Sequence, residues 1–119
     1  MTSQTFELDL IPQGVPPVIH VSQYDRGQVW FIKVLENGVP YEIPTGCSVT
    51  IQGSKPDSTA FQYACTYSGN IVAATLMRQM CAVVGDVTAE VRITANDAAQ
   101  IIGSLNFIIE VEEGSIADD

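Results

Sequence analysis

Short stretches in which apolar and polar residues alternate dominate this chain. In Thr5–Leu10, three apolar residues alternate with Glu7 and Asp9. Successive side chains of a strand point to opposite faces, so a period of two predicts a half-buried strand. The same reasoning, applied to β-branched and aromatic runs bounded by turn residues, predicts further strands at 18–21, 29–35, 48–53, 60–66, 71–76, 87–94 and 104–111, and an edge strand or connection at 39–43.

The strand at 29–35 is the most hydrophobic of these and contains the only tryptophan. Lys33 sets its phase, because a charged side chain points to solvent and its two neighbours then point inward. We therefore predict that Trp30, Ile32 and Val34 form a core face.

One stretch departs from the period of two. In 76–84 the apolar residues recur at offsets of 3 and 4, with Thr75 as a possible N-cap and Gly85 as a stop signal. This spacing predicts a single short helix of about two turns near 76–84.

Turn residues separate the predicted strands. Asn37-Gly38 favours a type I′ hairpin turn, and Pro56 and Asp57 occupy positions typical of a β-turn. Seven or eight short strands with turns every ~8–12 residues are typical of an antiparallel β-sandwich. We expect one such domain over 1–113, followed by an acidic flexible tail over 114–119 that leads toward a missing or absent C-terminal region.

Composition narrows the class of protein. The 119 residues carry 14 Asp and Glu against 5 Lys and Arg, a formal net charge of −9, and 46% of them are hydrophobic. Such a chain is too apolar to be intrinsically disordered, and no segment approaches the ~20 apolar residues of a membrane span. Because it has no such span, we expect no membrane as partner. An acidic surface repels nucleic-acid backbones, so we expect no nucleic acid as partner either.

Candidate chemistry is sparse. His20 is the only histidine and has no partners at the spacing of a Ser–His–Asp relay or a zinc motif. The sequence has no glycine-rich nucleotide motif and no calcium-loop spacing. We therefore interpret the carboxylates near the C-terminus as part of a solvated tail that begins near Glu112. These carboxylates belong to Glu112, Glu113, Asp118 and Asp119. We predict no enzyme activity, no catalytic residues, no cofactor and no metal.

The cysteines and tyrosines leave two further expectations. Cys47, Cys65 and Cys81 form no CxxC pair and are odd in number, which predicts small buried hydrophobes in a protein that folds in a reducing cytosol. The first residues show no secretory signal. Four tyrosines could instead form a sugar-stacking surface, which makes a non-catalytic carbohydrate-binding module the alternative; they are Tyr24, Tyr41, Tyr63 and Tyr67.

The order of these segments resembles a known family. The hairpin at 29–46 with its Asn-Gly turn is followed by Val49–Ser58, which is similar to the family's pattern of strand, Gly and Lys-Pro-Asp-Gly, with Ser58 in place of the last Gly. Gly69–Val72, Leu76–Gly85 and a last strand ending at Asn106–Val111 come next in the same order. The chain from about Phe6 to Glu113 thus resembles the N-terminal domain of phage baseplate upper proteins, found in tailed phages and prophages of Gram-positive hosts.

The resemblance implies an immunoglobulin-like β-sandwich that serves as a virion structural protein. Such a domain docks on a central baseplate or distal tail protein and carries a distal fibre or receptor-binding module. Related domains form the N-terminal part of head-fibre proteins, so the resemblance leaves both the tail and the head as attachment points. It also leaves open whether the protein forms a homo-oligomer in a symmetric particle. The expected location is the virion, assembled in the host cytoplasm. The family has no catalytic residues to carry over.

Overall fold

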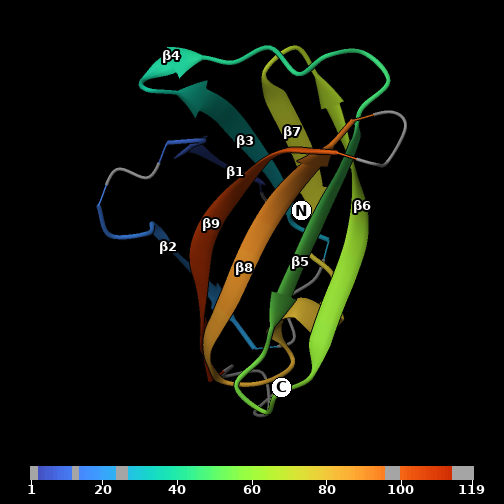
Figure 1. Cartoon of the computed structure of the whole chain (residues 1–119). Helices are drawn as coiled ribbons and strands as arrows, with labels where there is room; N and C mark the ends of the chain where they lie inside the picture. The colour runs from blue at the N-terminus through green and yellow to red at the C-terminus, as the bar shows by residue number, and fades with distance from the viewer. Residues whose placement is uncertain (1–2, 12–13, 24–26, 96–99, 114–119) are drawn as a thin grey trace.

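A computed structural model describes residues 3–11, 14–23, 27–95 and 100–113. Within these ranges the chain forms almost only strands (Figure 1), which confirms the all-β prediction. The elements are β1 (Ser3–Asp9), β2 (Val18–Ser22), β3 (Val29–Glu36), β4 (Val39–Pro40), β5 (Ser48–Ser54), β6 (Ala60–Ser68), β7 (Ile71–Thr75), the 3-10 helix η1 (Arg78–Cys81), β8 (Gly85–Thr94) and β9 (Ile101–Glu112).

The strands form one curled sheet with two layers. Its order is β1-β3-β7-β6-β5-β8-β9-β2, and β4 pairs with β3. β6 joins the layers, because its first part, up to Cys65, pairs with β5 and its last part, from Thr66, pairs with β7. In Figure 1, β5, β8 and β9 lie in front of β1 and β3. This arrangement is compatible with an immunoglobulin-like sandwich.

Two strand pairs correct the expectation of a wholly antiparallel sheet. β1 runs parallel to β3, and β2 runs parallel to β9. The physical reason is the connection between β1 and β2, which places the two strands at opposite ends of the sheet order instead of folding them into a hairpin. Each then pairs with the free edge of a strand that runs in its own direction, and parallel pairs need such long-range crossovers.

The predicted helix near 76–84 is shorter than expected. Only Arg78–Cys81 form a helical turn, of the 3-10 type. Thr75, the expected N-cap, is instead the last residue of β7. Leu76 is still bonded like a strand residue, because its N–H donates to the carbonyl of Gln28 at 2.7 Å. The apolar spacing still has a structural role, since Leu76, Met80 and Cys81 are all fully buried at one end of the core.

The core lies between the two layers and has an aromatic centre. Trp30, Ile32 and Val34 are fully buried, which confirms the predicted core face of β3. The rings of Phe6, Trp30 and Phe107 meet there, with centroid distances of 5.7, 5.8 and 6.1 Å. Since the three residues belong to β1, β3 and β9, this aromatic triangle ties the two layers together.

The turn between β5 and β6 explains the Lys-Pro-Asp pattern. Lys55 is buried, and its Nζ donates to Oε1 of Gln79 on η1 at 3.0 Å. Pro56 packs so closely on Gly85 that a side-chain Cβ at that glycine would lie 2.9 Å from the proline ring. The turn thus fastens β5 and β6 to the segment that leads into β8. Ser58 has a φ of 73°, a left-handed conformation in which glycine is the favoured residue.

Candidate functional site

Unpaired strand edges are the most prominent binding feature of the described chain. β1 pairs only with β3, so its other edge is open. β2 pairs with β9 only from Ile108 onward, which leaves the preceding half of β9 paired with β8 alone. Unpaired backbone N–H and C=O groups of an edge can pair with another chain. Within the described residues, unpaired edges thus occur on β1, on the outer side of β2, which ends the strand order, and on the first half of β9.

A cavity of about 350 Å³ lies between the edges of β1 and of the first half of β9. Its walls mix carboxylates, amides and apolar side chains, contributed by Glu7, Leu8, Asp9, Leu35, Ser104, Asn106 and residues 14–17. Val15 on its rim is 87% exposed, and Ile11 of the same connection and Val18 at the start of β2 are also exposed. Exposed apolar side chains beside an open edge are typical of a protein-binding surface.

Asp9 on this rim has a structural role. Its carboxylate accepts hydrogen bonds from the backbone N–H groups of Ile11, Asn37 and Gly38 at 2.8–2.9 Å. Desolvation raises the pKa of Asp9, but the three N–H bonds outweigh it and hold the pKa below its ordinary value. Asn37 and Gly38 have φ values of 53° and 81°, which confirms the positive-φ turn predicted there. Asp9 thus holds β1 against this turn.

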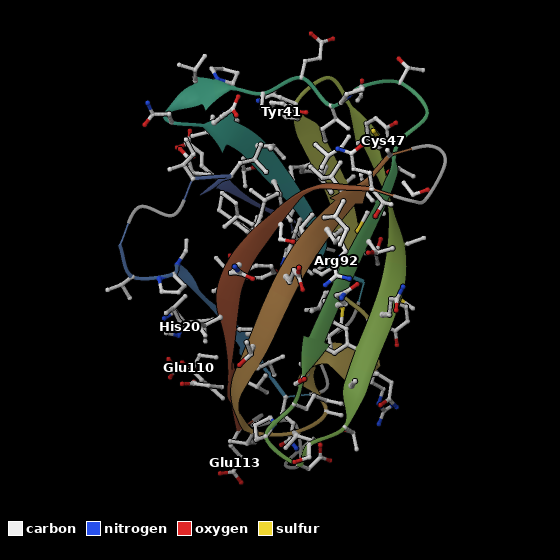
Figure 2. All side chains as sticks on the ribbon, viewed as in Figure 1. His20, Tyr41, Cys47, Arg92, Glu110 and Glu113 are labelled. Atoms are coloured by element: carbon white, nitrogen blue, oxygen red, sulfur yellow. The ribbon has the colours of Figure 1, made fainter. Side chains whose placement is uncertain are left out.

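A second feature is a cluster of His20, Glu110 and Glu112 on the outer face of β2 and β9. His20 lies directly opposite Glu110 in the parallel register, and Glu112 follows on the same face. Nδ1 of His20 is 3.7 Å from Oε1 of Glu110 and 3.4 Å from Oε2 of Glu112. Figure 2 shows His20 and Glu110 side by side at this edge. One imidazole and two carboxylates are a donor set that can hold a metal ion.

This cluster could not be found from the sequence alone. We expected the solvated tail to begin near Glu112, and this was wrong, because the structure places this residue at the end of β9. The two-residue spacing of Glu110 and Glu112 signals a shared strand face. Their approach to His20, which lies far away in the chain, depends on the parallel register and has no local signal. Asp118 and Asp119 lie outside the described residues.

The three tyrosines that the structure describes do not form the exposed platform of the carbohydrate-binding alternative. Tyr41, Tyr63 and Tyr67 are half-buried and pack against the core. The Tyr67 hydroxyl donates to the carbonyl of Pro44 at 3.0 Å, and the ring of Tyr63 stacks on Phe61. Tyr24 lies outside the described residues. The three described tyrosines therefore take part in packing.

The cysteines confirm the expectation of small packed side chains only in part. Cys81 is fully buried, whereas Cys47 and Cys65 are half-buried, and all three are free thiols. Burial raises the pKa of the Cys65 thiol to about 11. A thiol with a raised pKa is a poor nucleophile at neutral pH. Within the described residues, no helix has the length and apolar character needed to cross a membrane.

Comparison with known proteins places this geometry in a family. The family model for the BppU N-terminal domain matches residues 2–119. Among solved structures, the N-terminal domain of phage TP901-1 ORF48 has the same fold, with a TM-score of 0.75, 15% sequence identity, and 94% of this chain and 99% of that chain covered. No curated protein matches the chain. This chain therefore belongs to the family of baseplate upper protein N-terminal domains.

Proposed function

We propose that this domain is an anchoring module of a phage virion, which attaches a distal fibre or receptor-binding module to the baseplate through protein–protein contacts. The observation that carries the proposal is the family match over residues 2–119. Its partners are other virion proteins, namely a central baseplate or distal tail protein on one side and the distal module on the other. The domain has no catalytic role in this assignment.

The open edges support this proposal. The N–H of Leu10 donates to Leu35 of β3, so alternate backbone groups of β1 point toward β3 and the intervening ones, as at Glu7, point away from it. An extended segment of a virion protein can pair with such outward groups, a mode in which main-chain bonds provide affinity. The exposed side chains of Ile11 and Val15 add apolar contact area beside the same edge.

The proposal is tested with the purified domain as bait against disrupted phage particles, together with antibody labelling of intact particles. We expect the domain to recover a central baseplate or distal tail protein and the antibody to label the baseplate. Recovery of no virion component, together with unlabelled particles, would refute the anchoring role.

A pair of charge reversals tests the edge itself. Glu7 lines the cavity beside the open edge of β1, whereas Glu42 is also exposed but does not line that cavity. We expect Glu7→Arg to weaken capture of the virion partner and Glu42→Arg to leave it unchanged. Equal effects of the two variants would show that the partner binds elsewhere on the domain.

A further inference from the structure

We propose that His20, Glu110 and Glu112 bind a divalent transition-metal ion of the Zn²⁺ type, independently of the anchoring role. The three donors come from two adjacent strands, β2 and β9, and their ligand atoms lie within 4.8 Å of one another. The backbone register fixes this arrangement, because His20 and Glu110 are paired residues and Glu112 follows two positions along the same face. No donor depends on a loop.

The distances between the donor atoms match the edges of a tetrahedral zinc site. Zn–N and Zn–O bonds are about 2.0–2.2 Å long, so two ligand atoms of a tetrahedral site lie about 3.4 Å apart. Nδ1 of His20 is 3.4 Å from Oε2 of Glu112 and 3.7 Å from Oε1 of Glu110. Both separations exceed the ~2.7–3.2 Å of an N–H···O hydrogen bond. These separations are those of ion pairs between His20 and the two carboxylates, and they also suit three donors that share one metal ion.

The local charge also favours a cation. Asp86 of β8 lies directly opposite Glu110, so this carboxylate has another carboxylate on one side and His20 on the other. Like charges directly opposite each other on paired strands are destabilising. Among the described residues, both ion pairs that reach Glu110 and Glu112 come from His20. A divalent ion at the cluster would offset the repulsion among these carboxylates, which the single imidazole of His20 does not neutralise.

The strands that carry the donors are held firmly from the inside. The residues on either side of His20, Ile19 and Val21, are buried in the core, as are Ile109 and Val111 beside the two glutamates. Ligands on packed strands are pre-positioned, which lowers the ordering cost of binding. The side chains themselves remain accessible, since those of His20 and Glu112 are both 59% exposed.

The donor set selects the class of metal. Ca²⁺ and Mg²⁺ prefer ligand shells made only of oxygen, whereas an imidazole nitrogen suits Zn²⁺ and its transition-metal neighbours. Three protein ligands leave a fourth position for water. The bound ion would clamp the five-residue edge strand β2 onto β9.

The test is a titration of the tag-free full chain with ZnCl₂ at neutral pH by isothermal titration calorimetry, with the thermal midpoint followed in parallel. We expect one-to-one binding in the wild type and a rise in Tm, because a ligand that binds only the folded state stabilises it. Affinity should fall at least ten-fold in His20→Gln and in Glu110→Gln. It should be unchanged in Glu113→Gln, which removes the same charge next to the cluster; Glu113 follows β9 (Figure 2).

Three results would each overturn the proposal. One is the absence of zinc binding in the wild type. Another is unchanged affinity in His20→Gln, which would place zinc elsewhere, for example on the half-buried thiols of Cys47 or Cys65. The last is an equal loss of affinity in Glu113→Gln, which would indicate only general attraction to an acidic surface. Circular dichroism of each metal-free variant checks that it is folded, and Glu112→Gln provides a second ligand variant should Glu110→Gln be unfolded.

Discussion

The ring of Phe6 lies edge-on against the ring of Trp30, with 5.7 Å between the centroids and 71° between the ring planes. Phe6 also touches Phe107 of β9, and β1 pairs with no strand other than β3. This side chain therefore supplies much of the attachment between the β1 edge and the opposite layer.

We expect Phe6→Ala to lower the free energy of unfolding by about 2–4 kcal/mol, slightly less than for a fully buried ring because Phe6 is half-buried. Phe6→Leu retains most of the volume and should cost less than about 1.5 kcal/mol. Urea unfolding followed by the fluorescence of Trp30, the only tryptophan, measures both values. An alanine variant as stable as the wild type would contradict this role for the ring.

Ser58 has a conformation that its side chain disfavours. A left-handed φ costs a non-glycine residue roughly 1–2 kcal/mol, and glycine loses roughly 0.5–1 kcal/mol more backbone entropy on folding. With a φ of 73° at Ser58, Ser58→Gly should therefore stabilise the domain by about 0.5–1 kcal/mol. The control is Ser54→Gly within β5, which we expect to lower Tm. A lower Tm in Ser58→Gly would show that the serine is not strained.

Two glycines on different strands, Gly53 of β5 and Gly103 of β9, should respond differently to alanine. A Cβ at Gly53 would lie 2.5 Å from the carbonyl oxygen of Thr88 and 2.9 Å from the ring of Phe61, and backbone cannot move aside cheaply. A Cβ at Gly103 would meet the tip of Leu10, a flexible side chain. We expect Gly53→Ala to cost about 1–3 kcal/mol and Gly103→Ala clearly less, measured by thermal unfolding. The reverse order would contradict the close packing at Gly53.

Asp9 predicts a particular dependence of stability on pH. Its pKa is lower in the folded chain than the ordinary value of 3.8, so its contribution is fully present above that value and is lost as the pH falls through the folded pKa. Asp9→Asn should lower Tm at pH 7, because the amide replaces a charged acceptor of three N–H groups. The difference from the wild type should shrink below about pH 4. A difference that stayed constant down to pH 2 would contradict the assignment.

Most of the strands were predictable because they obey a local rule. The alternation around Trp30 and the Asn37-Gly38 turn determine both the phase and the end of β3, and the structure agrees on each. The spacing in 76–84 was misread, because offsets of 3 and 4 also occur in a single 3-10 turn flanked by extended residues such as Met77. Periodicity alone does not separate these two cases.

The pairing of distant strands was not predictable in the same way. Which edge β2 occupies is decided by packing of Ile19 and Val21 in the shared core, and this choice alone brings His20 to Glu110. The cavity beside β1 likewise arises from two edges far apart in the chain. Local sequence signals describe each strand, whereas these two surfaces exist only between strands.

The position of β9 has a mechanical consequence. This strand is bonded along its length to β8 on one side and, over its last residues, to β2 on the other. A tension applied at Glu112 along the strand axis would load both ladders in shear. The perpendicular hydrogen bonds of the antiparallel β8–β9 ladder and the slanted bonds of the parallel β2–β9 ladder would then resist together instead of opening one after another. A load carried outward from this end of β9 thus meets the most tear-resistant direction of the sheet.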